Sequence, residues 1–458
     1  MMAIDNDYWQ HIKNKYVTQP VHIAPLAVLR MVFGAVMFIS TARFMANGWV
    51  KDFFITPTFH FPFYGFEWVR PFPPTGMYVL YGVMLLAALC VAIGLFYRVA
   101  VATFFLCFCY AELIDKTYYL NHYYLVSIIT FLLMLTPAHR YFSLDVLRKP
   151  ALKVTQVPAW TIYIFQLQLC IVYFFAGLSK VNYDWLIAAM PLKIWLHAKE
   201  QTPYLGILLR QSWSPWVFSW AGALFDLSIA FLLMGRRTRK VGYAMVVIFH
   251  VLTALLFQIG MFPYIMMAVT IIFFPASFHW QLIRLLSGGR GLPEQQVVLP
   301  WPPHKAKAMY GLLVLYFSWQ LFMPVRFLLY PGKLLWTEEG YRFSWRVMLM
   351  EKGGTTFFYI KNPATGRQFE INNARLLTPY QERMMETQPD MMLQYAHLLH
   401  DTYAKKGIPD PQVSVASYVS LNGSGSRLYI DSTVNLATQR ESWFGHKTWI
   451  LPFKKNQP

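Results

Sequence analysis

Nine long apolar runs constrain the fold of this chain more than any other feature of its sequence. A membrane-spanning helix needs about 20 mostly apolar residues, because the hydrocarbon core of a bilayer is about 30 Å thick. The runs that meet or approach this length are residues 24–42, 76–96, 98–114, 120–138, 160–179, 215–234, 241–258, 261–277 and 308–324. The eighth run is alternatively a re-entrant segment, since only "QIGMFPY" separates it from the seventh. We therefore predict a multi-pass α-helical membrane protein with about eight or nine transmembrane helices.

The composition supports a membrane protein and argues against a nucleic-acid-binding one. Of the 458 residues, 56% are hydrophobic and only 14% are charged, whereas a soluble chain of this size needs more polar surface. The formal net charge of +18 would suit a nucleic-acid partner. The Lys and Arg residues, however, are concentrated in short clusters between the apolar runs. We therefore expect a lipid membrane as a partner and no nucleic acid.

The basic clusters occupy alternate loops, and this pattern predicts the topology. They lie near residues 13–15, 98, 140–153, 236–240 and 284–307. Loops rich in Lys and Arg stay in the cytoplasm, so the N-terminal segment (residues 1–23) is expected there. The polar residues of 112–124, 180–214 and 258–264 then share the opposite face with everything after about residue 330.

The sequence changes character after the predicted transmembrane domain (residues 24–326). In residues 327–458, "GTTFFYI" (354–360), "QVSVASYV" (412–419) and "RLYIDSTV" (427–434) are typical of strands. Residues 378–405 are typical of an amphipathic helix that begins at "TPYQE", and "NGSG" (422–425) of a turn. We predict a small α+β domain on the extracytoplasmic side.

The stretch "AELIDKTYYLNHYYL" (111–125) gathers polar residues at the junction of two apolar runs. Ionisable groups at a membrane boundary are costly and usually face a cavity or each other. For Asp115 and Lys116, a tight loop with two solvated charges is an equally good interpretation. His122 follows Asn121, which we interpret as a helix cap, and its functional role depends on its neighbours.

Lys180 ends the apolar run of "QLCIVYFFAGLSKVNYDW" (168–185), and Asp184 follows one helical turn later. The lysine could be a snorkelling anchor, half of an ion pair or a base. Snorkelling is the commonest role at a helix end, although anionic headgroups are enriched on the other, cytoplasmic face. A lysine desolvated among apolar side chains is held in its neutral form, which can act as a base.

Two further ionisable residues, Asp226 and His250, fall within apolar runs. An ion pair between Asp226 and His250 would explain both structurally, and a catalytic role is the alternative. The four cysteines lie inside apolar runs without a C-x-x-C pair, and we therefore expect no metal site.

Several long motifs resemble one known family. They are "DKTYYLNHYYL", "QLCIVYFFAGLSKVNYDW", "LFDLSIAFLL", "FQIGMFPYIM" and "QLFMPVRFLLYPGKLLWTEEGYRFSWRVM". Together, over about residues 20–350, they resemble the vitamin K-dependent gamma-carboxylase family, which includes bacterial horizontally transferred transmembrane (HTTM) homologues.

The resemblance implies a membrane enzyme that uses reduced vitamin K (menaquinol or phylloquinol), dioxygen and carbon dioxide, and no metal. By this likeness, Lys180 deprotonates the hydroquinone and His122 supports the chemistry. Oxygen addition then yields a strong base that removes a glutamyl γ-proton, and the carbanion captures carbon dioxide. A glutamate-containing protein or peptide is the implied substrate. The residues expected to bind the quinone are Asn121, Tyr183, Gln258 and Met261. The residues expected around them are Asp115, Lys116, Asp184, Asp226 and His250.

The sequence differs from the animal enzymes in three ways. Ser179 stands where they have a second lysine, the C-terminal domain is much shorter, and no cysteine follows Cys170. These differences favour quinone epoxidation over glutamate carboxylation and suit a bacterial inner-membrane protein. The alternatives are an epoxidase-only homologue and a non-catalytic membrane transporter or scaffold that keeps the fold.

Overall fold

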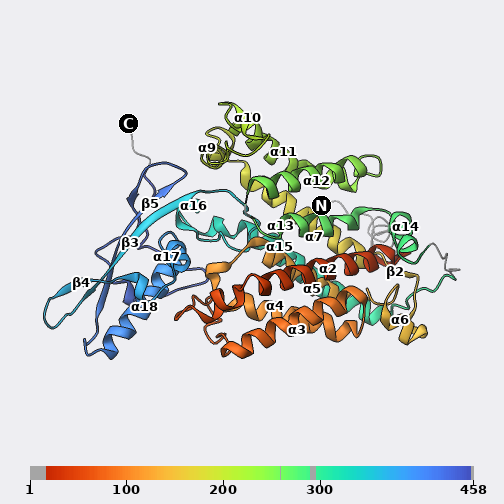
Figure 1. The fold of residues 1–458 in the computed structure, drawn as a ribbon, viewed down its shortest axis with the longest axis horizontal. Coiled ribbons are helices and arrows are strands. Elements are labelled where there is room, and N and C mark those ends of the chain that lie inside the picture. The colour runs from red at the N-terminus through yellow and green to blue at the C-terminus, as the bar shows by residue number, and fades with distance from the viewer. Residues whose placement is uncertain (1–16, 258, 289–294, 455–458) are drawn as a thin grey trace, which may run out of the picture.

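A bundle of apolar helices forms one end of the molecule and a mixed α+β domain forms the other (Figure 1). The structure is a computed structural model that describes residues 17–257, 259–288 and 295–454. Among these residues, seven helices are long and apolar enough to cross a membrane, or eight if one bent pair counts as a single span. The seven are α2 (Ala24–Ala46), α3 (Pro74–Ile93), α4 (Tyr97–Ile114), α7 (Trp160–Lys180), α11 (Ser214–Met234), α12 (Arg239–Leu256) and α15 (Pro303–Val325). The prediction of a multi-pass membrane protein with a small α+β domain is confirmed.

Two of the nine predicted spans differ from the prediction: one helix is shorter than expected and one is broken. The run at 120–138 forms α5 (Asn121–Leu135), which has 15 residues and stops just before Pro137. At about 1.5 Å per residue it is shorter than the hydrocarbon core. The run at 261–277 is broken: α13 (Phe262–Thr270) leads through a 3₁₀ turn, Ile271–Phe273, into α14 (Ala276–Leu286), with a bend of 115°. Pro275 lies at this break and cannot continue the helix.

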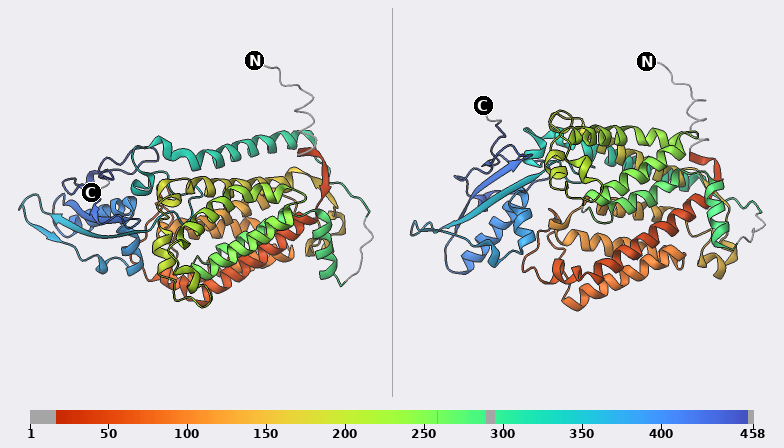
Figure 2. Two further views of the ribbon diagram at one scale, coloured as in Figure 1. Left: turned by 90° about the horizontal axis from the view of Figure 1, so that it is seen from above. Right: turned by 45° about the horizontal axis from the view of Figure 1, so that its top comes forward.

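Helices pack both against their neighbours in the sequence and against helices far along the chain. The α2 helix packs against α3, α13 and α14, and α7 packs against α11. The α15 helix runs along one side of the bundle toward the C-terminal domain, as the left view of Figure 2 shows in teal. The connection from α7 to α11 carries three short helices, α8 (Tyr183–Leu186), α9 (Leu192–His197) and α10 (Gly206–Leu209).

The end of the bundle away from the C-terminal domain is tied by a small sheet. Strand β1 (Pro20–His22) pairs antiparallel with β2 (Gln156–Pro158), near α6 (Leu144–Arg148) and α14 (Figure 1). Several of the basic clusters lie at this end, whereas residues 112–124 lie at the end next to the C-terminal domain.

The C-terminal domain is a four-stranded antiparallel sheet with helices packed on it. The strand order is β4 (Gln368–Glu370), β3 (Lys352–Lys361), β5 (Gln412–Leu421) and β6 (Arg427–Leu428). The long strands β3 and β5 pair from Lys352 with Leu421 to Lys361 with Gln412. The predicted strand at 427–434 is thus only two residues long, while the turn at 422–425 is confirmed by left-handed backbone at Asn422, Gly423 and Gly425.

The helix predicted at 378–405 is two helices, α17 (Pro379–Met385) and α18 (Pro389–Lys405). Thr378 and Gln381 form a capping box at the start of α17, as the "TPYQE" signal predicted. The break lies just before Pro389, because a proline disfavours helical backbone in the residue that precedes it. A further short helix, α16 (Leu334–Thr337), connects the bundle to the sheet.

Candidate active site

A cavity of about 420 Å³ lies where the helix bundle meets the C-terminal domain. We call it the His122 cavity. Its walls come from the end of α2, the connection between α4 and α5, the start of α13, and residues 341–348 of the segment before β3. Asn121, His122 and Met261 line it. The structure therefore brings together three of the predicted site residues, while Gln258 lies outside the described residues.

Asn121 is fixed by side-chain contacts rather than by capping. Its Nδ2 donates to the backbone oxygen of Arg346 at 2.8 Å, and the Tyr119 hydroxyl donates to its Oδ1 at 3.1 Å. The same hydroxyl accepts from the backbone N–H of Phe343 at 2.8 Å. The helix starts at Asn121 itself, with Leu120 at the cap position and no side-chain cap, so the prediction of a capping Asn is wrong. Its side chain instead joins α5 to the segment before the sheet.

His122 lies on the cavity wall, and no hydrogen bond to its ring occurs among the described residues. Its ring is buried and packs edge-on against Tyr123, with centroids 4.5 Å apart, and lies 5.9 Å from the ring of Phe262. Because no hydrogen bond to this ring occurs among the described residues and the ring lines the cavity, His122 can contact a ligand there.

Lys180 is half of a buried ion pair. Its Nζ lies 2.6 Å from Oδ2 of Asp226, and it also donates to the backbone oxygen of Ala176 at 3.2 Å. The lysine is 6% exposed and Asp226 is 4% exposed. The prediction of an Asp226–His250 pair is therefore wrong: the carboxylate binds the lysine of a neighbouring helix.

The close approach of α7 to α11 makes this pair. A Cβ added at Gly177 would lie 2.8 Å from the backbone nitrogen of Leu227, so a glycine is required for the two backbones to come together. One turn further along, Lys180 reaches Asp226. Lys180 is not among the residues that line the His122 cavity, and its side chain lies 5.5 Å from the ring centroid of Trp185.

His250 occupies a packed environment inside the bundle. Its Nε2 lies 3.4 Å from the Tyr173 hydroxyl, and its ring is surrounded by those of Phe225, Phe249 and Phe262. The Nδ1 atom is buried without a hydrogen-bond partner. His250 therefore packs behind Phe262, which itself lines the His122 cavity.

A second cavity, of about 640 Å³, lies beside the end of α7. We call it the α7 cavity. Ser179, Tyr183 and Asp184 line it, together with Arg346, which also lines the His122 cavity. Asp184 accepts from Lys333 Nζ at 2.7 Å and from Asn422 Nδ2 at 3.3 Å. Tyr183 and Asp184 therefore line a different cavity from Asn121, His122 and Met261, and Arg346 borders both cavities.

Asp115 and Lys116 are buried at the junction with the C-terminal domain, and not solvated in a loop. Lys116 Nζ lies 2.7 Å from Oδ2 of Asp390, and Asp115 accepts from Gln381 Nε2 at 3.0 Å. Burial raises the pKa of Asp115 to about 6, against the opposing effect of hydrogen bonds from Thr117 and Gln381. Both residues hold the C-terminal domain on the bundle.

Arg342 completes a junction cluster of paired charges, which we define as Lys116, Arg342, Lys352, Glu338 and Asp390. Arg342 lies 2.6 Å from Asp390, and Lys352 lies 2.7 Å from Glu338. Although burial works to raise the pKa of Asp390, the cations Arg342 and Lys116 hold it well below its usual range.

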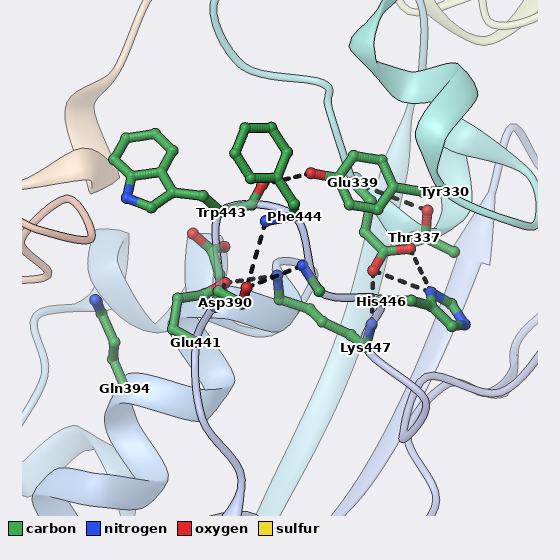
Figure 3. A network of polar contacts seen from close by, with 12 residues as sticks. Tyr330, Thr337, Glu339, Asp390, Gln394, Glu441, Trp443, Phe444, His446 and Lys447 are labelled. Atoms are coloured by element: carbon green, nitrogen blue, oxygen red, sulfur yellow. Dashed lines mark hydrogen bonds and ion pairs between the residues drawn. The ribbon is translucent and has the colours of Figure 1, made fainter.

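A polar network beside this cluster fastens the last loop of the domain (Figure 3). Glu339 accepts from His446 Nδ1 at 2.9 Å and from the backbone N–H of Lys447 at 2.7 Å. Lys447 pairs with Glu441 at 2.7 Å, and the Tyr330 hydroxyl donates to a backbone oxygen of the same loop at 2.6 Å. These contacts fix residues 441–447 against the segment that follows α15.

Sequence reasoning missed Arg43, Tyr119 and Arg346 as lining residues. Arg346 lies within "YRFSWRVM" (341–348), a stretch that carries the family resemblance but gave no sign that its side chain borders two cavities. No group of three or more His, Cys, Asp or Glu residues that could hold a metal occurs in the described ranges.

Comparison with known protein families agrees with the motifs. A family model of the HTTM domain matches residues 18–280, and one of the vitamin K-dependent gamma-carboxylase lumenal domain matches residues 305–456. The chain belongs to the vitamin K-dependent gamma-carboxylase family. The second match extends beyond residue 350, where the quoted motifs end. No solved structure matches the chain.

The two family matches indicate the general function of the chain. It is a membrane-embedded, carboxylase-type enzyme with a vitamin K-dependent gamma-carboxylase-like activity and reduced vitamin K as its cofactor. The His122 cavity suits such a cofactor, because its volume is in the range of small-molecule sites and its walls are largely aromatic.

Proposed function

We propose that this chain is a vitamin K hydroquinone-dependent γ-glutamyl carboxylase with quinone epoxidase activity. The supporting observation is the aromatic His122 cavity, in which a buried histidine lacks a hydrogen-bond partner among the described residues. When bound, the hydroquinone together with dioxygen supplies the strong base for removal of the glutamyl γ-proton before carbon dioxide is captured. Asn121, His122 and Met261 would hold the quinol ring, with Tyr183 and Gln258 as further proposed binding residues.

Lys180 is the proposed base, and its ion pair with Asp226 changes how it would act. A charged pair is expensive in a dry interior, so a proton shared between the two side chains can also reside on the carboxylate. The amine is then neutral and able to accept the quinol proton. Asp226 would thus be a positioning residue that holds the amine at the end of α7.

The proposed location is a bacterial inner membrane, with the site and the C-terminal domain (residues 327–458) on the extracytoplasmic side of the transmembrane domain (residues 24–326). This placement rests on the distribution of basic clusters among the loops. Reporter fusions after residue 240 and after residue 350 should report opposite compartments, and finding both in the cytoplasm would contradict it.

The direct test incubates the purified protein in detergent with reduced vitamin K and oxygen and measures the epoxide by chromatography. A second arm adds a glutamate-containing peptide and labelled carbon dioxide. Epoxide with labelled peptide supports the full reaction, and epoxide alone supports an epoxidase-only homologue. Absence of epoxide from the folded protein would contradict both and favour a transporter or scaffold.

The role of Lys180 is tested by Lys180→Arg, which keeps a positive charge opposite Asp226. A guanidinium cannot be deprotonated at accessible pH, so an ion-pair role survives this change and a base role does not. We expect Lys180→Arg to lose epoxide formation by at least about a hundredfold, as is typical for loss of a proton-transfer group. Full activity would show that position 180 supplies only charge.

A further inference from the structure

The His122 cavity carries positive charge without a counter-ion of its own. Two arginines line it, Arg346 and the exposed Arg43, and none of its described lining residues is Asp or Glu. Arg43 lies over the ring of Trp49, 4.9 Å from its centroid. A cavity lined by one sign of charge concentrates ligands of the opposite sign.

Of the two arginines, Arg346 is the buried one. It is 8% exposed, and its described partners are the backbone oxygen of Pro324, at 3.2 Å from Nη2, and the ring of Phe327, at 4.4 Å from Cζ. Both partners line the α7 cavity, so Arg346 borders the two cavities at once. Its Nε is buried without a hydrogen-bond partner. Within the described residues, no carboxylate lies at ion-pair distance from this guanidinium.

The charge on Arg346 persists at neutral pH. Burial lowers its pKa to about 10, which leaves the guanidinium almost fully protonated at pH 7. A buried charge without a partner costs several kcal/mol. By contrast Arg342, four residues earlier, lies against Asp390 at 2.6 Å. Arg342 thus has a carboxylate partner, whereas Arg346 has none among the described residues.

The walls around this charge suit a flat aromatic ring. Phe53 stacks on Tyr118 with centroids 4.0 Å apart, and Tyr118 stacks on Tyr380 at 5.4 Å. Phe44 and Phe262 complete the apolar lining. Aromatic side chains favour stacked or edge-on contacts with another ring, so the cavity combines an aromatic container with an unpaired guanidinium.

We propose that Arg346 binds the oxyanion of an aromatic hydroxyl in the His122 cavity, and that under the proposed function this is the deprotonated hydroxyl of the quinol. The O–H bond breaks, its proton leaves to the base, and the electron pair stays on the oxygen beside the guanidinium. Arg346 itself neither gives nor takes a proton. A charge-assisted hydrogen bond from the guanidinium makes the oxyanion more stable than the neutral cavity wall alone would.

The test measures binding rather than turnover. Two air-stable naphthoquinones serve as probes, one with a hydroxyl that is ionised and coloured at neutral pH, and menadione, which has no ionisable group. Each is titrated into the purified full-length protein in detergent, and affinity is read from quenching of tryptophan fluorescence. The colour change of the bound hydroxynaphthoquinone with pH reports whether the protein prefers the anion.

We expect Arg346→Gln to weaken the hydroxynaphthoquinone about tenfold or more, since hydrogen bonds to charged groups are the stronger class, and to change menadione affinity less than twofold. The bound hydroxynaphthoquinone should also ionise at a higher pH in this variant. Arg346→Lys should restore part of the anion affinity, because the charge returns without the planar fork. Arg367→Gln, which removes an exposed arginine from the turn between β3 and β4, is the matched control and should change neither probe.

Equal loss of both probes would show that Arg346 only shapes the cavity, and unchanged binding of the anion would show that it does not contact it; either result overturns the proposal. The outcome is separable from that of the proposed function. Selective loss of the anion in Arg346→Gln, with no epoxide from the parent protein, would support the anion site and contradict the carboxylase. Epoxide formation by the parent protein, with unchanged anion binding in Arg346→Gln, would support the carboxylase and contradict the anion site.

Discussion

The junction cluster and the His122 cavity each contain one arginine from the segment before β3, and the two arginines have different partners. In the junction cluster Lys116 and Arg342 share Asp390, and Lys352 lies against Glu338. Arg346, which borders the His122 cavity and the α7 cavity, has a carbonyl oxygen and an aromatic ring as its described partners. The two arginines are four residues apart in one segment, so local sequence does not account for the difference.

This difference separates charges that hold the fold from charges that are available to a ligand. A paired charge has its desolvation offset inside the protein, whereas an unpaired one is stabilised fully only when something binds. By this criterion Lys180 belongs to the first class, because Asp226 lies 2.6 Å away. Its proposed role as a base therefore needs the pair to share a proton.

The largest effect is expected from breaking the junction cluster at its shared carboxylate. Asp390→Asn leaves Lys116 and Arg342 buried without an anion, which should lower the free energy of unfolding by about 3–5 kcal/mol. Denaturant titration of the purified protein in detergent measures it. Asp410→Asn, at a carboxylate whose side chain is 88% exposed, is the control and should stay within about 0.5 kcal/mol. If both variants lost the same small amount of stability, the ion pairs of the junction cluster would not be stabilising the fold.

Lys180 tests whether the ion pair inside the bundle behaves like the junction cluster. Lys180→Ala leaves Asp226 buried and unpaired, so we expect a loss of about 3–5 kcal/mol in the free energy of unfolding. This differs from the small cost of removing a snorkelling lysine. The double variant Lys180→Met with Asp226→Leu removes both charges and should recover most of that loss, again by denaturant titration. If the double variant did not recover stability, the loss in Lys180→Ala would not come from leaving the charge of Asp226 unpaired.

The most direct comparison replaces Arg342 and Arg346, one at a time, by glutamine. Arg342→Gln leaves Asp390 with Lys116 alone and should cost about 2–3 kcal/mol of unfolding free energy, whereas Arg346→Gln removes an unpaired charge and should cost less than about 0.5 kcal/mol or stabilise the protein. Thermal unfolding followed by tryptophan fluorescence ranks the two. If Arg346→Gln were the more destabilising variant, Arg346 would have a structural role and the comparison would fail.

The smallest effect concerns pH and Asp115. Its folded-state pKa of about 6 is above the value of about 3.9 in an unfolded chain. The folded protein therefore binds the proton more tightly, and stability increases as the pH falls from about 6 toward 4. Linkage gives a gain of about 1–3 kcal/mol.

Asp115→Asn removes this titration while keeping an oxygen for the Thr117 N–H, so the gain between pH 7 and pH 4.5 should disappear in the variant. Asp390 contributes with the opposite sign but only as the pH falls below about 4, because its pKa is lowered in the folded state. Identical pH profiles of the two proteins, measured by thermal unfolding, would show that the burial of Asp115 does not shift its ionisation.

Much of the fold follows from the sequence, because long apolar runs and alternating strands are local patterns. The bundle, the α+β domain, the capping box at Thr378 and the break-prone run at 261–277 could all be predicted from neighbours in the chain. The run at 120–138 was predicted too long, because Thr136 has extended backbone where it precedes Pro137 and the helix ends at Leu135. The family resemblance likewise came from contiguous motifs.

The partner of each charge was decided by the tertiary structure alone. Asp226 and Lys180 are 46 residues apart, and they meet because Gly177 lets α7 approach α11. Asn121 reaches residue 346 rather than capping its own helix. The sequence contains 40 Lys and Arg residues but only 22 Asp and Glu residues. It therefore shows that some cations must lack a carboxylate partner, but not which ones. Only the packing of distant segments leaves Arg346 buried and unpaired beside His122, because pairing depends on distances in space that residue types and spacing do not specify.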